Sequence, residues 1–204
     1  MVHDVISPVD NKLMGQRVGD ILRIKRSIDG PWGVMKPDSI LDKLCKNPHP
    51  LLLNVHDFCE DWIVVEYLEK PLMLYLHNNP RYKNQESWME IHGKNCDAKC
   101  IDNFKKQIKE AVGTLHKINL LHGDLQVNNV VIPSMHPHYR LPRCNKNIKL
   151  IDYGSIVDLD VPLEEHGGGI QNPGVTSKTV ESENKWMERM FKELDNKWAK
   201  LKKS

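Results

Sequence analysis

The sequence lacks the features that mark secreted and membrane proteins. None of its 204 residues falls in an apolar run approaching the roughly 20 residues that a membrane span needs. The first ten residues, MVHDVISPVD, lack the basic start and apolar stretch of a signal peptide. The five cysteines are odd in number and scattered along the chain. We therefore expect free thiols, a reducing cytoplasmic location and no membrane partner.

A strong charge of either sign is also absent. Lysine and arginine together number 29, against 27 aspartates and glutamates, which gives a net charge of +2. A balance this close to neutral gives no reason to expect nucleic acid as a partner. The hydrophobic content of 40% and charged content of 27% are typical of globular domains. The length allows one domain or two small lobes.

Hydrophobic periodicity predicts a chain that mixes helices and strands. Strands are predicted at DILRIKR, PHPLLLNVHDF and DWIVVEYLE, and short helices at PDSILDKLCKN and LMLYLHNN. A longer helix starts near Ile101 and is followed by the short strands NVVI and IKLID. The chain closes with an amphipathic helix, which either packs on the rest of the protein or docks a partner. The apolar stripe of the longer helix consists of Ile101, Phe104, Ile108, Ala111 and Leu115.

A polar segment lies directly after that longer helix. Residues 120–132, LLHGDLQVNNVVI, place Asp124 and Asn129 between apolar flanks. Buried polar groups cost several kcal/mol unless they find partners, so such a loop is either a decorated hairpin turn or a site for a charged ligand. A hairpin turn explains neither the preceding helix nor the later triplet that starts at Asp152.

The helix, this motif and the later IKLIDYGS together resemble the catalytic core of the protein kinase superfamily, over about residues 38–156. Asp124 and Asn129 keep the D-x4-N spacing of the family, and Asp152-Tyr153-Gly154 takes the place of D-F-G. The combination of H-G-D with D-Y-G is similar to that of vaccinia-related-like kinases. The resemblance implies an α+β, two-lobed fold with a reduced N-lobe and a truncated, mainly helical C-lobe.

The same resemblance implies a division of the chain into three parts. Residues 1–68 would form the reduced N-lobe and hinge, and residues 69–180 the core of the C-lobe. Residues 181–204 would form the C-terminal amphipathic helix. Within the first part, EYL resembles the segment that faces adenine, so Glu66 and Leu68 are its predicted cofactor-binding residues.

The resemblance also implies ATP and Mg²⁺ as cofactors and a serine or threonine hydroxyl of a protein as the acceptor. Asp124 would orient the attacking hydroxyl. Gln126 stands where such kinases place a lysine, and it would donate a hydrogen bond but no charge near the transferred phosphate. Asn129 and Asp152 would offer oxygen ligands to Mg²⁺.

The motifs with which kinases bind the phosphates of ATP are poorly matched in this sequence. GQRVG does not match G-x-G-x-x-G. Lys25 is our candidate for the lysine of the third strand, because Lys36 lies too close to the next predicted helix. An exposed strand lysine remains the alternative for Lys25. The chain has no glutamate before Glu60 to pair with this lysine, so Asp38 or Asp42 would serve instead.

Other departures from the family keep two alternatives open. Gly123 replaces the arginine that grips a phosphorylated loop, which implies that no such switch operates here. H-G-D and Gln126 favour a small-molecule phosphotransferase of the aminoglycoside or choline kinase type. The missing glutamate and degraded glycine loop favour a pseudokinase that acts as a binding module. After Gly154 there is neither A-P-E nor an apolar helix like the one that anchors a full C-lobe.

Overall fold

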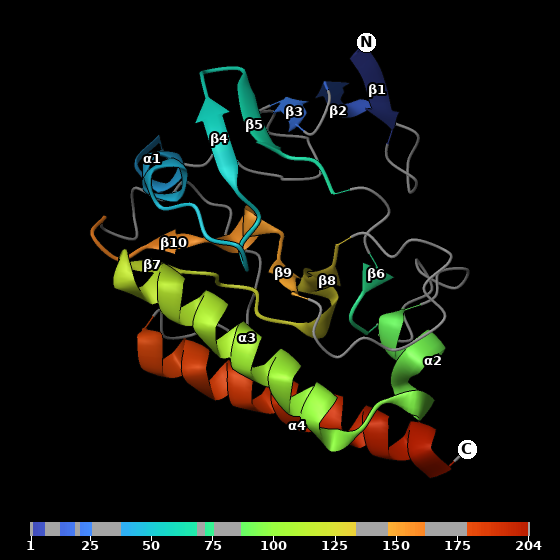
Figure 1. The fold of residues 1–204 in the computed structure, drawn as a ribbon. Helices are drawn as coiled ribbons and strands as arrows, with labels where there is room; N and C mark the ends of the chain where they lie inside the picture. Colours follow the sequence, from blue (N-terminus) through green and yellow to red (C-terminus); the bar gives the residue numbers. More distant parts are fainter. Residues whose placement is uncertain are drawn as a thin grey trace.

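The computed structural model describes eight stretches of the chain: residues 2–6, 13–18, 21–25, 38–68, 72–75, 87–133, 147–161 and 179–203. Helices and strands are mixed throughout these stretches, as expected for an α+β protein. A sheet lies at one end of the molecule and a pair of long helices at the other, with two small sheets between them (Figure 1).

The larger sheet is built from the first part of the chain. Its order is β1-β2-β3-β5-β4, and all neighbours are antiparallel. The predicted strand at DILRIKR is confirmed as β3, which pairs with both β2 and β5. The strands are β1 (Val2–Ile6), β2 (Leu13–Val18), β3 (Ile21–Lys25), β4 (Val55–Phe58) and β5 (Trp62–Glu66).

Helix α1 (Asp38–Lys46) follows β3 in the chain and contacts β4. Its sequence predicted a helix because Ile40, Leu41 and Leu44 recur at helical spacing, and all three are buried. Asp38 lies in the first turn and basic residues lie in the last, as the helix dipole favours. The helix therefore presents an apolar face to the core of the protein.

Two predicted elements differ from the structure. Of the predicted strand PHPLLLNVHDF, only β4 joins the larger sheet. The residues before it bond to Leu150 instead, and the amide of Leu53 donates to the Leu150 carbonyl at 3.0 Å. LMLYLHNN was predicted as helical, but Leu72 and Met73 form the strand β6 (Leu72–Met73). Pairing with a neighbouring strand outweighs the local helical pattern there.

The middle of the molecule contains two small sheets. In one, β7 (Leu120–Leu121) pairs antiparallel with β10 (Val157–Asp158). In the other, β6 pairs with β8 (Val130–Ile132), which pairs with β9 (Lys149–Leu150). The connections of these strands bring the segment after β7 close to the segment after β9.

The long helices α3 (Ala98–Lys117) and α4 (Val180–Lys203) run antiparallel and side by side (Figure 1). Ion pairs between Lys105 and Asp195 and between Lys109 and Glu188 join them. The apolar stripe of α4 is buried, so the final helix packs on the protein. No described helix has the length and apolar character to cross a membrane. The buried apolar side chains of α4 are Met187, Met190, Phe191 and Leu194.

A shorter helix, α2 (Trp88–His92), precedes α3 and begins with a capping box. The Ser87 hydroxyl accepts from the amide of Glu90, and the Glu90 carboxylate accepts from the amide of Ser87. A single turn of 3-10 helix, η2 (Gly93–Asn95), leads from α2 to the Asp97 cap of α3. The predicted division at residues 68 and 180 stays a prediction.

Candidate active site

The loop after β7 holds Asp124 with two amide side chains. The carboxylate oxygen Oδ2 of Asp124 accepts from Gln126 Nε2 at 2.8 Å and from Asn129 Nδ2 at 3.1 Å. Asn129 Nδ2 also donates to the backbone carbonyl of Asp124 at 2.8 Å. Because Asn129 is buried and its amide nitrogen is committed to Asp124, its side-chain oxygen is the atom left to bind a ligand.

The loop after β9 places Asp152 beside this first loop. The amide of Ile151 donates to the carbonyl of Asn129 at 2.9 Å, so Asp152 follows the point where the two loops join. Asp152 has φ 65° and ψ 75°, a left-handed conformation that is uncommon for a residue other than glycine. Its Oδ1 accepts from the amide of Gly154 at 3.1 Å, which caps the single 3-10 turn η4 (Tyr153–Ser155). Backbone strain of this kind gathers at functional sites.

His122 and Tyr153 fasten the two loops to each other and to the segment before β4. His122 is fully buried, and its Nε2 lies 2.9 Å from the carbonyl of Ile151. Its ring meets the Tyr153 ring edge to face, with centroids 6.1 Å apart. The Tyr153 hydroxyl donates to the carbonyl of Leu53 at 2.9 Å. Burial, with the nearby charge of Glu66, raises the pKa of Tyr153, so this hydroxyl stays a donor at neutral pH.

A buried carboxylate of α4 binds the backbone of the first loop. Glu183 is 5% exposed, and its Oε1 accepts from the amide of Gly123 at 2.8 Å. Its Oε2 lies 2.7 Å from Nε2 of His116 on α3. The amide next to Asp124 is therefore held by both long helices. The sequence offered a signal for Glu183 that we missed: an acidic residue on the apolar stripe of α4, four residues before Met187.

The structure gives a steric reason for Gly123 itself. Gly123 has φ +75°, and a Cβ added there would lie 2.0 Å from the carbonyl oxygen of Ser155. No side chain fits this close approach between the two loops, so arginine could not stand at this position without moving them. The predicted absence of a phosphorylation switch stays a prediction.

Gly123→Ala is expected to lower the free energy of unfolding by about 2–4 kcal/mol, through the left-handed conformation and the overlap with Ser155. Gly113→Ala is the matched control, because Gly113 lies in α3 with nothing within 4 Å of an added Cβ. It should be neutral or stabilising by up to about 1 kcal/mol. Urea unfolding of both variants measures the difference, and equal stabilities would contradict the proposed close approach.

Glu66, in the segment predicted to face adenine, is the last residue of β5, and its side chain binds within the protein. Its Oε1 accepts from Lys149 Nζ at 2.6 Å and from the amide of Asn54 at 2.8 Å. Lys149 is 9% exposed and also donates to the carbonyl of Leu52 at 3.0 Å. The predicted contact of Glu66 with a nucleotide stays a prediction. Leu68 is half-buried and packs against the core.

The predicted nucleotide-gripping residues are only partly described. Lys25 is the last residue of β3 and pairs with Trp62 of β5, and Asp38 opens α1. Asp42 forms a surface ion pair with Lys46 at 2.7 Å. The pairing of Lys25 with Asp38 or Asp42 stays a prediction.

Two further positions from the same prediction remain. Lys36 and Gly19 lie outside the described residues. Gly15 lies inside β2, opposite Ile24 of β3, so GQRVG is not a loop around a glycine pair.

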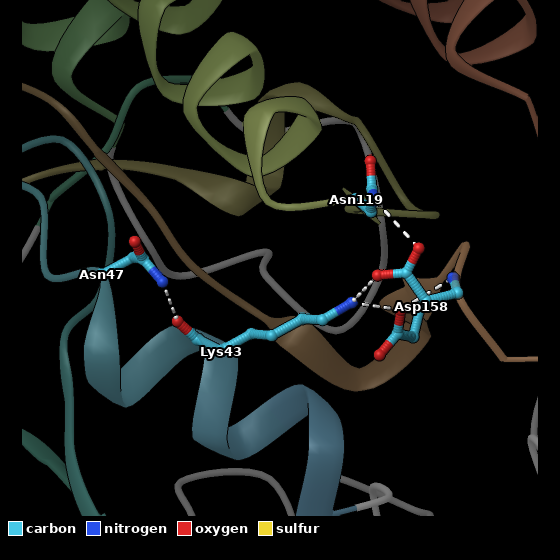
Figure 2. Close-up of polar contacts among 5 residues, drawn as sticks. Lys43, Asn47, Asn119 and Asp158 are labelled. Carbon is cyan, nitrogen blue, oxygen red and sulfur yellow. Dashed lines mark hydrogen bonds and ion pairs between the residues drawn. The ribbon is translucent and has the colours of Figure 1, made fainter.

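A cluster of charges ties α1 to the strands that carry the two loops (Figure 2). Lys43 Nζ lies 2.5 Å from Asp158 Oδ1 and 2.7 Å from Asp160 Oδ2. Asn119, in the turn before β7, donates to Asp160 Oδ1 at 2.9 Å. Asp158 is 1% exposed. No local sequence pattern predicted this cluster, because Lys43 and Asp158 are 115 residues apart in the chain.

Lys43→Met should destabilise the protein by about 2–4 kcal/mol, because it removes the cation from a buried carboxylate. Lys46→Met is the matched control: Lys46 also lies in α1, but its only ion pair in the described structure is the exposed one with Asp42. That control should change stability by less than about 0.5 kcal/mol. Thermal or urea unfolding at pH 7 would compare the two variants.

The effect of Lys43→Met should depend on pH. The bond from Lys43, with that from Asn119, lowers the pKa of Asp160 below 3.8, so this stabilisation is present above pH 3.8 and is lost as the pH falls further. Burial lowers the pKa of Lys43, but its bonds to Asp158 and Asp160 outweigh burial and raise the pKa above 10.5. The stabilisation that comes from the Lys43 charge persists through neutral pH and is lost above pH 10.5. A stability difference between parent and Lys43→Met that did not shrink below pH 3.8 would contradict this assignment.

The oxygen atoms of Asp152 and Asn129 suit a cation whose remaining ligands are phosphate oxygens and water. Among the described residues, no group of three or more histidine, cysteine, aspartate and glutamate side chains is placed to hold a metal. Mg²⁺ is usually bound by one or two protein carboxylates and completes its shell with phosphate oxygens and water. The Asp152 carboxylate and the Asn129 amide oxygen fit that mode. Their assignment as metal ligands stays a prediction.

Asp124 opens onto a cavity between its own loop and α4. The cavity has a volume of about 280 Å³ and is lined on one side by Asp124 and Gln126. Trp186, Arg189 and Glu193 of α4 line the other side. The arrangement gives the Asp124 carboxylate a space in which a second molecule could present a hydroxyl.

Comparison with known proteins adds only a weak structural likeness. No protein-family model matches the sequence, and neither does any curated protein. A crystal structure of the Rad53 kinase domain and SCD2 in complex with AMPPNP is 15% identical over 76% of this chain, with a TM-score of 0.42. A structure of the Rad53 kinase domain and SCD2 is 17% identical over 78%, with a TM-score of 0.44. This chain spans about half the length of each of these structures (47% and 49%).

Proposed function

We propose that the protein is an ATP- and Mg²⁺-dependent phosphotransferase of the protein kinase type that acts on hydroxyl groups of proteins. The observation that carries this proposal is the junction of the two loops. Asp124, Gln126 and Asn129 are in direct contact, and the carbonyl of Asn129 binds the residue before Asp152. The kinase motifs assign hydroxyl orientation to Asp124 and cation binding to Asn129 and Asp152.

The proposed roles follow from the hydrogen bonds of each side chain. Two amide donors fix the Asp124 carboxylate, so it can accept a hydrogen bond from an incoming hydroxyl and align it without first reorganising. Gln126 uses its amide nitrogen on Asp124, so in this arrangement it positions the carboxylate. Asn129 and Asp152 would hold Mg²⁺, which neutralises charge on the transferred phosphoryl group. The buried contacts of His122, Tyr153 and Glu183 keep the two loops rigid.

One observation favours the pseudokinase alternative. The β1–β2 connection, residues 7–12, reads SPVDNK and contains no glycine. Glycine-rich loops let backbone amides approach phosphates closely, so the grip on a nucleotide would be weaker here. Retention of Asp124, Asn129 and Asp152 favours an enzyme, because a binding module has no chemical need for all three.

Thermal unfolding with ATP tests the proposal at its first step. A ligand at 100 times its dissociation constant, bound only to the folded state, stabilises a protein by about 2.7 kcal/mol. We expect ATP to raise the melting temperature in the presence of Mg²⁺ and much less in EDTA. The absence of any shift at millimolar ATP and Mg²⁺ would contradict the proposed nucleotide site.

A further inference from the structure

A second cavity adjoins the one beside Asp124. Arg189 and Glu193 line both cavities, so the two meet on one face of α4. The second cavity is open to solvent, has a volume of about 400 Å³ and is bordered by Tyr75 and the C-terminal half of α4. We call the two cavities together the α4 groove. It runs from Asp124 towards the C-terminal end of the helix.

The charges of the α4 groove are segregated along its length. The end nearest the loop contains the carboxylates of Asp124 and Glu183, and Glu193 and Arg189 both lie where the cavities meet. The far end is basic, although the whole chain has a net charge of only +2. The cations that line the second cavity are Arg189, Lys192, Lys197 and Lys200.

Aromatic rings support two of these cations. The Arg189 guanidinium lies 5.1 Å from the centroid of the Trp186 ring, and Lys197 Nζ lies 4.6 Å from that of Tyr75. Lys197 also lies 3.8 Å from Glu90 Oε1 of α2. Such contacts orient long side chains that would otherwise lose more entropy on binding. Lys192 and Lys200 are exposed and complete the basic end.

Helix geometry sets the distance between the two ends. Glu183 binds the amide next to Asp124, and at 1.5 Å per residue Arg189 lies about 9 Å further along α4, and Lys197 about 21 Å. An extended peptide rises about 3.3 Å per residue. The basic end would therefore meet side chains about three to six residues away from a hydroxyl placed at Asp124.

We propose that the α4 groove binds the acceptor as an extended protein segment, with acidic residues about three to six positions from the phosphorylated hydroxyl. The hydroxyl of this substrate rests on the proposed function, and its acidic residues are inferred from the basic end of the groove. A peptide can confine its negative charge to one end. A nucleic acid cannot, since its phosphates would also meet the carboxylates near Asp124, where repulsion disfavours binding.

The test uses one serine peptide in a neutral background and versions with glutamates three to six residues before or after the serine. The groove variant is Lys192→Glu with Lys200→Glu, and the matched control is Lys185→Glu with Lys203→Glu. The control changes the same number of α4 charges, at positions that line neither cavity. Measurements are kcat/KM for each peptide and, independently of catalysis, binding of the labelled peptides by fluorescence anisotropy at low salt.

We expect the parent and the control variant to prefer one acidic peptide by about tenfold, in both kcat/KM and affinity. The groove variant should lose that preference, and salt should weaken it in the parent. The proposal would be overturned if the parent had equal kcat/KM and affinity for acidic and neutral peptides. It would also be overturned if the groove variant kept the preference of the parent. A duplex oligonucleotide that binds more tightly than the acidic peptide and displaces it would overturn it as well. Charge-dependent peptide binding without any phosphate transfer would uphold the groove while rejecting the proposed function.

Discussion

Replacing Asp124 with asparagine is expected to slow phosphate transfer by about 10²- to 10⁴-fold while nucleotide binding persists. Positioned acid–base groups typically contribute a factor of that size. Asparagine keeps the shape, and its amide oxygen can still accept from Gln126 and Asn129. What it removes is the charge that draws and aligns the acceptor hydroxyl. Steady-state transfer rates and ATP-induced melting shifts, measured on the same preparation, separate the two effects.

The matched control for this variant is Asp102→Asn. Asp102 lies exposed on α3, outside the two loops, so its substitution should leave transfer and binding unchanged. An Asp124→Asn protein that transferred phosphate as fast as the parent would contradict the role of Asp124.

Asp152→Asn is expected to remove the Mg²⁺-dependent part of ATP binding, while the protein stays folded. The amide oxygen of asparagine can replace Oδ1 as acceptor for the amide of Gly154, and asparagine tolerates the left-handed conformation at this position. A neutral amide is a poor substitute for a carboxylate as a ligand of Mg²⁺. At 100 times the parent's dissociation constant, the lost stabilisation would approach about 2.7 kcal/mol.

Isothermal titration of ATP with and without Mg²⁺ would measure this loss directly. The Asp102→Asn protein again serves as control, and circular dichroism would establish that the Asp152→Asn protein is folded. An unchanged ATP affinity in Mg²⁺ would contradict the assignment of Asp152 as a metal ligand.

Some parts of the fold and of the site were predictable from sequence, because they depend on residues close together in the chain. The buried stripes of α1, α3 and α4 recur at helical spacing, and Asp124 and Asn129 are five residues apart in one loop. Their mutual hydrogen bonds follow from that spacing and from a tight 3-10 turn, η3 (Val127–Asn129).

The parts that escaped prediction depend on contacts between distant segments. The pairing of β6 with β8 overrode a helical pattern, and the bond between Lys43 and Asp158 spans 115 residues. The ion pair between Glu66 and Lys149 joins residues 83 positions apart, and no local pattern predicted it. A sequence shows that such charged residues exist. Only the fold shows which of them meet.

The most direct test of the proposed function is transfer of the labelled γ-phosphoryl group of ATP to protein. The purified chain would be incubated with Mg²⁺, labelled ATP and a mixture of serine- and threonine-containing peptides, with Asp124→Asn as the matched control. We predict incorporation into peptide hydroxyls by the parent, and about 10²- to 10⁴-fold less by the variant. A parent that binds ATP but labels neither the peptides nor itself would contradict the enzyme and leave a nucleotide-binding module.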